Sequence, residues 1–271
     1  MFFSMKHLKE LFPSLLEVII NPEEIRWAVA ILFSRGWKFE NEGYWCLLPL
    51  ADFFNHSFSQ PKEEVLQQTD EGHFMITAIG HTNKNEEIFI RYGCEDNAQL
   101  LVLYGFLDMN ENLDNIMLEI ELDFPLSEYS TELIIHAGLL DYIDGDCFRY
   151  TWVVDSNDPS SIDDEDLFYC LRLSIITAKE YQERMNEEPD RSVPFSLRSE
   201  LQMYQYLLDS VQHRLNYYGY SAEEDHRYIE RSDKLSYNER NILALQIAEK
   251  TMLHRLSEHF QTKVDSLHNK S

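Results

Sequence analysis

Apolar residues follow two different patterns along the chain. Up to Phe124, short apolar runs alternate with polar turns, which is typical of short strands joined by loops. Beyond Pro125, apolar residues recur at steps of three and four positions, which predicts amphipathic helices packed as a bundle. We therefore predict an α+β fold of two domains, a β-rich domain at residues 1–124 and an all-α domain at residues 125–271.

Helical signals are also present near the start of the chain. Residues 6–20 have a helical apolar period that Pro13 interrupts. Asn21 suits the capping position of a second helix, and Pro22 suits its first turn. This second helix is expected to end near Gly36, because glycine is a frequent helix terminator.

Strand signals follow these helices. Residues 44–50 are largely apolar and predict a buried strand that leads into a polar turn containing Asn55. Residues 73–79 and 87–92 predict the two strands of a hairpin, since a polar turn region separates them. In this arrangement the polar turn and Tyr92, at the end of the last strand, lie at one end of a small sheet.

The second half of the chain carries most of the helical signals. A helix is expected from Asn97, followed by a strand at 116–124 and helices at 127–140, 163–184, 196–218 and 237–260. Ser221 with Glu224, and Ser236 with Glu239, form two capping boxes, because each pairs a hydroxyl cap with a carboxylate three positions later. Both boxes predict helix starts.

Length and composition bound the class of protein. The chain has 271 residues, of which 44% are hydrophobic, enough to bury a core in each of two domains. No apolar run approaches the roughly 20 residues that cross a bilayer, and the start of the chain lacks the apolar core of a secretory signal. We therefore expect a cytoplasmic or nuclear protein with no membrane partner.

The net charge of the chain limits the classes of molecule that it is expected to bind. The formal net charge of −25 argues against direct binding of nucleic acid, because the phosphate backbone would be repelled. A basic protein segment would be attracted instead. The alternative is that the acidity only keeps the protein soluble.

Cysteine spacing gives no sign of a metal site. Cys46, Cys94, Cys147 and Cys170 are scattered without a C-x-x-C pair. Neither a zinc site nor a disulfide framework is indicated, and we expect no bound metal.

Several short motifs occur in a specific order and spacing. They are Asp52-Phe53-Phe54-Asn55-His56-Ser57, then Glu87-Ile88-Phe89-Ile90-Arg91-Tyr92-Gly93, then Asn97-Ala98-Gln99 and Tyr104-Gly105-Phe106. This series resembles the second half of a SET domain. More narrowly, it is similar to the branch typified by the Rubisco large-subunit lysine methyltransferase, in which a helical substrate-binding domain follows the SET domain. The resemblance covers almost the whole chain and implies a partial SET domain at its start.

The resemblance implies an activity and a set of site residues. Members of this family transfer a methyl group from S-adenosylmethionine to a lysine side chain of a protein, so the implied partner is a lysine-containing protein segment. By resemblance, Tyr92 is the catalytic residue. The implied cofactor-binding residues are Arg35, Asp52, Phe53, Phe54, Asn55, His56, Tyr104, Gly105 and Phe106.

Each of these residues also has a purely structural interpretation. Arg35 is placed to complement the dipole at a helix C-terminus. Asparagine and aspartate in a turn commonly hydrogen-bond their own backbone, and a single histidine such as His56 is often structural. Tyr92 could be a buried tyrosine that ends a strand. Without the surrounding motifs, these interpretations would be favoured.

The chemistry of methyl transfer explains why a tyrosine is expected at the reacting centre. The attacking nitrogen must lie in line with the methyl group and the sulfonium sulfur, and a fixed phenol oxygen can hold the amine in that geometry. The amine must also be neutral. Lysine has an unperturbed pKa of about 10.4, so its proton must be lost before attack, which requires desolvation or proton loss to water.

One part of the family pattern is not found. A complete SET domain begins with a glycine-rich turn near the methionine end of the cofactor, whereas the first glycine here is Gly36. We therefore expect the N-terminal half of the SET domain to be missing from this chain. Two interpretations stay open: a truncated form of an active methyltransferase, and a catalytically inactive module that binds a protein partner through its helical domain.

The nucleophile is a separate question. One animal branch of the family methylates histidine and has a bulky tryptophan just before the aspartate of the central motif, where this chain has Ala51. That branch also places an asparagine where this chain has Trp37. These two positions predict lysine as the nucleophile, with histidine as the alternative.

Overall fold

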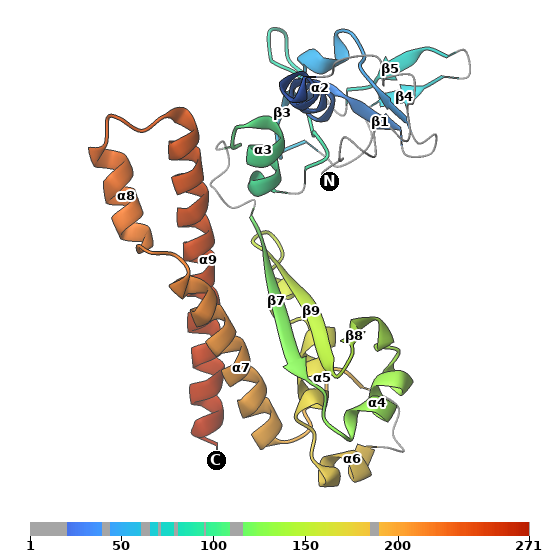
Figure 1. The fold of residues 1–271 in the computed structure, drawn as a ribbon, viewed down its shortest axis with the longest axis vertical. Helices are drawn as coiled ribbons and strands as arrows, with labels where there is room; N and C mark the ends of the chain where they lie inside the picture. Colours follow the sequence, from blue (N-terminus) through green and yellow to red (C-terminus); the bar gives the residue numbers. More distant parts are fainter. Residues whose placement is uncertain are drawn as a thin grey trace. The chain divides into compact units, whose positions relative to one another are not determined.

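The computed structural model describes residues 21–39, 44–60, 66–69, 72–78, 81–94, 96–108, 116–184 and 190–270. The chain divides into two compact units, Met1–Tyr92 and Gly93–Ser271 (Figure 1). The helix predicted at residues 6–20 lies outside the described residues. None of the helices in the described ranges has both the length and the apolar character needed to cross a bilayer.

The first unit opens with the predicted capped helix. Helix α2 (Pro22–Arg35) has Asn21 at its N-cap, where the side-chain oxygen accepts a hydrogen bond from the Glu23 amide at 3.0 Å. Pro22 occupies the first turn, where its missing N–H costs nothing. The helix ends before Gly36, whose amide donates to the Leu32 carbonyl. The local signals therefore placed this helix correctly.

The strands of the first unit form three two-stranded sheets. Strands β1 (Trp37–Phe39) and β2 (Tyr44–Cys46) pair antiparallel, as do β4 (Leu66–Gln68) and β5 (Phe74–Ile76). Strands β3 (Asn55–His56) and β6 (Phe89–Ile90) pair in parallel. The hairpin predicted between residues 73–79 and 87–92 is wrong, because β5 takes β4 as its partner and β6 takes β3.

A sharp turn connects β2 to β3. Leu50 has a φ of +74°, in the left-handed region that is unusual for a residue with a side chain. The short 3-10 helix η2 (Ala51–Phe53) follows it at once. Ala51 is buried with Leu48 and Leu66, which anchors the turn. The turn thereby places the half-buried Asp52 and the exposed Phe53 directly before β3.

The second unit starts with α3 (Asn97–Tyr104), which is capped at both ends. The Asp96 carboxylate accepts from the Gln99 amide at 2.9 Å. At the other end, Gly105 has a φ of +79°, a conformation that favours glycine and ends the helix. The helix predicted from Asn97 is therefore present, with its stop at Gly105.

A three-stranded antiparallel sheet follows, in the order β7-β9-β8. Its strands are β7 (Met117–Pro125), β8 (Ile143–Asp144) and β9 (Cys147–Asp155). Strand β7 was predicted, whereas β9 was not, so the expectation of an all-α second domain is wrong. The mixed α+β class holds. Strand β9 alternates buried and outward-facing residues along its length, with Phe148, Trp152 and Val154 buried, which is the period-2 pattern of a strand.

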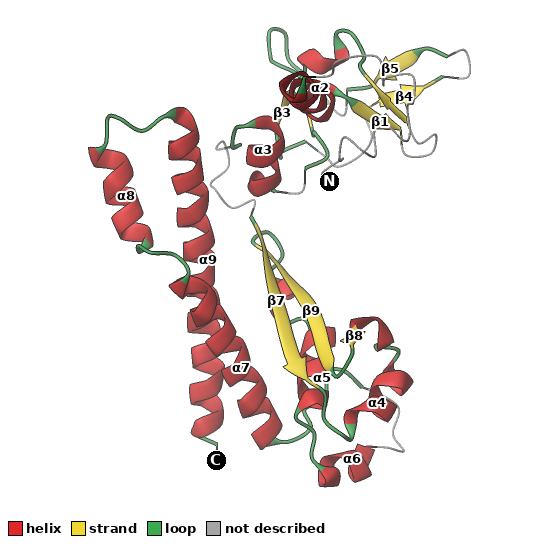
Figure 2. Cartoon of the chain, in the orientation of Figure 1, coloured by secondary structure: helices red, strands yellow, loops and turns green. Residues whose placement is uncertain are grey.

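Helices make up the rest of this unit (Figure 2). They are α4 (Ser130–Ala137), α5 (Glu165–Ser174), α6 (Ala178–Arg184), α7 (Leu197–Asn216), α8 (Ala222–Arg231) and α9 (Tyr237–His268). Both predicted capping boxes, at Ser221 and Ser236, are formed. The single helix predicted at 163–184 is instead two helices. The Glu180 carboxylate accepts from the Thr177 amide at 2.8 Å, a local cap that starts α6 anew.

The core of the second unit lies between the sheet and the helices. Its largest fully buried side chains include Trp152 of β9, Leu207 of α7, and Leu253 and Phe260 of α9. Strand β7 pairs with β9 along its full length. The compact units divide after Tyr92, so this break does not coincide with the domain boundary expected after Phe124.

Two buried ion pairs cross the helices. Arg172 of α5 donates from Nε and Nη2 to the two carboxylate oxygens of Glu200 on α7, at 2.5 and 3.0 Å, and its Nη1 donates to the Arg191 carbonyl at 2.8 Å. Lys250 of α9 is paired with Asp225 of α8. All four side chains of these pairs are buried, so each charge depends on its partner.

Candidate functional site

Tyr92 is held at the end of β6 by two hydrogen bonds to the β3 segment. Its backbone amide donates to Nδ1 of His56 at 3.0 Å, and its phenol hydroxyl donates to the Phe54 carbonyl at 2.6 Å. The rings of Tyr92 and His56 also contact each other, with centroids 5.2 Å apart. The parallel pairing of β3 with β6 makes these contacts possible, because it sets the two strand ends side by side.

His56 supports Tyr92 through its side chain. The imidazole is buried, and Nδ1 must carry a lone pair to accept the Tyr92 amide proton. In the neutral ring the proton is therefore on Nε2. The ring packs edge-on against Phe58 at 4.5 Å between centroids, and the Arg91 guanidinium lies 5.0 Å from the centre of the Phe58 ring. This packing fixes the orientation of the imidazole.

Arg35 and Asp52 form a pair close to this tyrosine. Arg35 is the last residue of α2, and its Nη1 lies 3.2 Å from the Asp52 carboxylate and 3.4 Å from the Asp52 carbonyl oxygen. The Arg35 side chain is still 52% exposed, so part of its donor fork faces solvent. This guanidinium can therefore bind an anionic group while it keeps its contact with Asp52.

Asn55 is oriented by a residue that the sequence did not single out for the site. Its side-chain amide donates to the Glu87 carboxylate at 2.6 Å. Because the nitrogen of the amide is engaged by Glu87, the orientation of the Asn55 carbonyl oxygen is also set. The sequence signal that could have identified Glu87 is its position at the start of the Glu87–Gly93 motif, which also contains Tyr92.

The charged groups around Tyr92 affect its acidity. Burial raises the pKa of the Tyr92 phenol; the nearby Arg35 guanidinium opposes this shift, and the Asp52 and Glu87 carboxylates add to it. The phenol therefore stays protonated at neutral pH. Since its proton is donated to Phe54, the phenol oxygen can act toward any further partner only as a hydrogen-bond acceptor.

The predicted site residues fall in both units. Arg35, the segment from Asp52 to His56, and Tyr92 come together in the first unit, where Phe53 is 71% exposed. Tyr104, Gly105 and Phe106 lie at the end of α3 in the second unit, with the two rings 6.3 Å apart. Within the described parts of the chain, no group of three or more histidine, cysteine, aspartate or glutamate side chains could hold a metal ion.

Two family models match the chain. The SET domain matches residues 16–93, and the Rubisco LSMT substrate-binding domain matches residues 137–253. The chain carries a SET domain and a Rubisco LSMT substrate-binding domain. The predicted motifs from Arg35 to Tyr92 all fall within the SET match. The helices α5, α7 and α8 fall within the substrate-binding match.

Solved structures of Rubisco LSMT share the fold of this chain. The structure of Rubisco LSMT bound to AdoMet superposes with a TM-score of 0.68 at 20% identity, over 97% of this chain and 61% of that chain. The structure of the SET domain of LSMT bound to lysine and AdoHcy gives a TM-score of 0.67 at 20% identity, over 96% of this chain and 58% of that chain. At this level of identity, the likeness establishes the fold alone.

Curated relatives include methyltransferases with different acceptors. The yeast (Saccharomyces cerevisiae) ribosomal lysine N-methyltransferase 1 is 31% identical over 93 residues, 34% of this chain and 15% of the relative. The chloroplastic [fructose-bisphosphate aldolase]-lysine N-methyltransferase of Arabidopsis thaliana is 22% identical over 94% of this chain and 53% of the relative. The dog (Canis lupus familiaris) actin-histidine N-methyltransferase is 23% identical over 86% of this chain and 40% of the relative. The chain thus spans about half or less of these relatives.

Proposed function

We propose that this chain is part of a protein-lysine N-methyltransferase that uses S-adenosylmethionine as the methyl donor. The observation that carries the proposal is the fixed position of Tyr92 within the SET match, because its amide donates to His56 and its phenol hydroxyl donates to the Phe54 carbonyl. The names of the lysine methyltransferases among the relatives support the same reaction class.

The polar and aromatic groups of the first unit fit the proposed cofactor. Arg35 offers guanidinium N–H groups to a carboxylate, as in an amino-acid moiety. The exposed ring of Phe53 offers an aromatic face to a flat base, and the oriented Asn55 amide offers directional hydrogen bonding. When bound, S-adenosylmethionine supplies an electrophilic methyl group on a sulfonium sulfur.

Tyr92 is proposed to position the substrate amine. Because its proton is committed to the Phe54 carbonyl, the phenol oxygen faces a substrate only as a hydrogen-bond acceptor. An amine N–H that donates to this oxygen has its lone pair directed away from it, and a fixed geometry of this kind lowers the entropic part of the barrier. The role of Tyr92 is then orientation and electrostatic stabilisation.

Tyr92 is a poor candidate for a general base. Its raised pKa keeps the phenol protonated at neutral pH, so it has no capacity to take a proton from the ammonium form of lysine. The amine must lose its proton to water before or during binding. The site therefore binds and orients a small fraction of neutral amine, and that fraction grows as the pH rises.

Lysine is favoured over histidine as the acceptor. Ala51, which comes directly before Asp52, is small and buried at the start of η2. The histidine-methylating branch has a tryptophan at this position, as noted above. The likeness to an actin-histidine N-methyltransferase keeps histidine as the second candidate. Mass spectrometry of methylated products distinguishes the two, because the modified residue is read directly.

Cofactor binding gives the first test. S-adenosylhomocysteine is titrated calorimetrically into the 271-residue chain, into Asn55→Ala, and into Asn238→Ala, an exposed asparagine of α9 that serves as the control. We expect binding by the parent chain and the control, and loss of binding by Asn55→Ala. A folded chain that fails to bind would support the alternative, a module that binds a protein partner through its helical domain without methyl transfer.

A further inference from the structure

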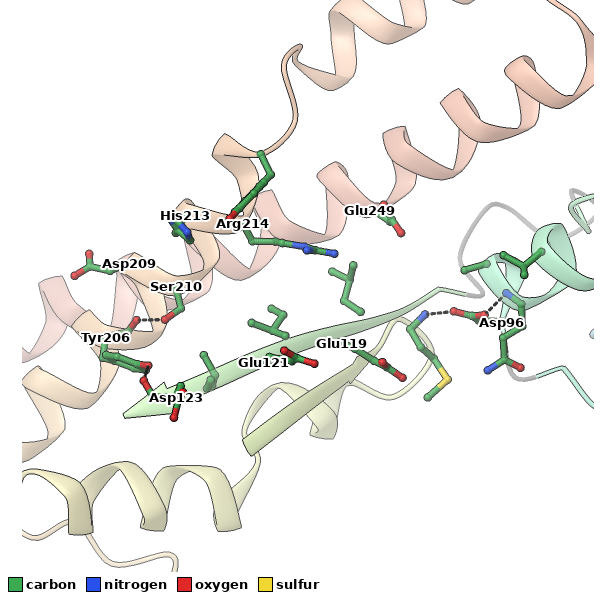
Figure 3. Close-up of a pocket in the computed structure, with 18 of the residues that line it drawn as sticks. Asp96, Glu119, Glu121, Asp123, Tyr206, Asp209, Ser210, His213, Arg214 and Glu249 are labelled. Carbon is green, nitrogen blue, oxygen red and sulfur yellow. Dashed lines mark hydrogen bonds between the residues drawn. The ribbon is translucent and has the colours of Figure 1, made fainter. Parts of the chain in front are cut away.

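The second unit contains a groove along β7 that the proposed chemistry does not use. Its volume is about 1080 Å³, and it is lined by β7, by the outer face of α7 and by residues of α3 and α9 (Figure 3). This volume slightly exceeds the usual range for small-molecule pockets, so the groove is large enough for a peptide segment of several residues.

The floor of the groove is an unpaired strand edge. In the order β7-β9-β8, β7 pairs with β9 on one side, and within the described ranges no strand pairs with its other side. The Ser156 amide donates to the Ile116 carbonyl at 3.0 Å, which makes these two opposed residues a hydrogen-bonded pair. By alternation, the odd-numbered residues of β7 direct their amide and carbonyl groups to the open edge.

Both ends of this open edge are capped by side chains. The Met117 amide donates to the Asp96 carboxylate at 3.2 Å, and the Tyr206 hydroxyl donates to the Asp123 carbonyl at 3.1 Å (Figure 3). Between these caps, the backbone groups of Glu119 and Glu121 face the groove. An open edge of this kind can pair with one further strand, which is a common mode of peptide recognition.

Charge identifies the chemistry of the occupant. The side chains of Glu119 and Glu121 are exposed on the same face of β7, and no ion pair joins either of them to another described residue. Asp209 on α7 and Glu249 on α9 add further carboxylates to the lining, and Arg214 is its arginine. The Asp123 carboxylate, at the end of β7, is already paired with Arg149 at 3.8 Å. A second copy of this acidic edge would be repelled, because like charges directly opposite each other destabilise a strand pair.

We propose that this groove binds an extended, basic segment of a protein by adding it as a strand to the open edge of β7. The added strand carries lysine or arginine at every second position, opposite Glu119 and Glu121. The other residues of the added strand lie on the same face of the sheet as Leu118, Ile120 and Leu122, which is the buried face, so these residues are apolar. This inference extends the proposed function, because it gives the protein substrate a docking surface. It rests on the proposed methyl transfer only where it identifies the bound segment as part of the substrate.

A peptide without lysine tests the groove independently of catalysis. We would measure the fluorescence anisotropy of a labelled nine-residue peptide that alternates arginine with valine, as the full 271-residue chain is added. The comparison peptide has the same composition but contiguous arginines. We expect the alternating peptide to bind at least about tenfold more tightly, since only its arginines lie on one face. Equal affinities would overturn the proposal.

Variants of the groove form the second part of the test. Glu119→Arg with Glu121→Arg should weaken binding of the alternating peptide at least about tenfold. The matched control, Glu230→Arg with Glu258→Arg, makes the same change in charge on exposed residues outside the groove lining and should alter affinity less than about threefold. A loss of equal size in both variants would mean that the peptide responds only to the net charge.

Backbone methylation of the peptide separates strand addition from simple charge attraction. In a strand paired to β7, every second residue directs its N–H to the partner and the residues between do not. The two sets of residues are the arginines and the valines of the alternating peptide. We expect N-methylation of one set to weaken binding at least tenfold, and N-methylation of the other set to weaken it less than threefold. Loss with the arginine set indicates antiparallel addition, and loss with the valine set indicates parallel addition. Similar effects of both sets, or self-association of the chain in place of peptide binding, would refute the proposal.

Discussion

The backbone amide of Tyr92 donates to Nδ1 of His56 at 3.0 Å, although the two residues are 36 positions apart. Removal of this acceptor in His56→Ala leaves the Tyr92 amide without its side-chain partner and opens space beside Phe58. We expect the free energy of unfolding to fall by about 2–4 kcal/mol. Urea denaturation measures this loss. His81→Ala, which removes an exposed histidine, should change stability by less than about 0.5 kcal/mol.

Tyr92→Phe removes the phenol oxygen and keeps the ring. In an active form of the protein, we expect kcat to fall about 100-fold, because the group proposed to orient the amine is lost. The affinity for S-adenosylhomocysteine should change less than about threefold. An equal loss in both quantities would instead mean that Tyr92 acts mainly by shaping the cofactor pocket. Steady-state kinetics and calorimetry on the same preparation separate these outcomes.

The raised pKa of Tyr92 sets an expected pH profile. The raised pKa keeps the phenol protonated at neutral and mildly alkaline pH, and the fraction of neutral lysine amine rises about tenfold for each pH unit below the lysine pKa. We therefore expect kcat/KM to increase steadily between pH 7 and 9 with no plateau from Tyr92. A plateau in this range that disappears in Tyr92→Phe would show that the phenol ionises within it and would contradict the assigned role.

Glu87→Gln tests the support given to Asn55. The glutamine keeps the size of the side chain but weakens a charge-assisted hydrogen bond, so the orientation of the Asn55 amide is less strongly fixed. We expect the affinity for S-adenosylhomocysteine to fall about three- to tenfold, with little change in stability, because Glu87 is exposed. Glu86→Gln, its exposed neighbour, is the control. An effect of Glu86→Gln as large as that of Glu87→Gln would point to overall charge.

The buried pair of Arg172 and Glu200 allows a stability prediction for the second unit. Glu200→Ala leaves a buried guanidinium without its bidentate partner and should lower the free energy of unfolding by about 3–5 kcal/mol. The double variant Arg172→Met, Glu200→Leu removes both charges and should be more stable than Glu200→Ala. Thermal and urea unfolding of the three proteins gives this order. A double variant less stable than Glu200→Ala would indicate that the pair stabilises the fold beyond satisfying its own charges.

Local signals predicted the helix ends well. Asn21, Ser221 and Ser236 each cap the helix that the sequence assigned to them, because a cap depends on residues within three positions. The split between α5 and α6 was missed for a related reason. Thr177 and Glu180 form a capping relationship inside a continuous apolar period, and the period alone gives one long helix.

Pairing between distant strands could not be predicted in the same way. Strands β3 and β6 are two residues each, too short for a periodic signal, and their parallel register depends on the rest of the unit. The motif series nevertheless identified Asn55, His56 and Tyr92 as neighbours. Strand β9 is a different case, since Phe148, Tyr150, Trp152 and Val154 alternate along the sequence and this period-2 pattern alone is a strand signal.

The contacts that fix Tyr92, His56 and Asn55 span a long stretch of intervening chain. The hydrogen bonds from Asn55 to Glu87 and from Tyr92 to the Phe54 carbonyl join residues 32 and 38 positions apart. The entropy of closing such a loop grows only with the logarithm of its length, so doubling the loop costs about 0.6 kcal/mol. Loops between β3 and β6 can therefore be lengthened at little cost in free energy and without moving Tyr92, provided that Phe58 and Leu66 keep their packing.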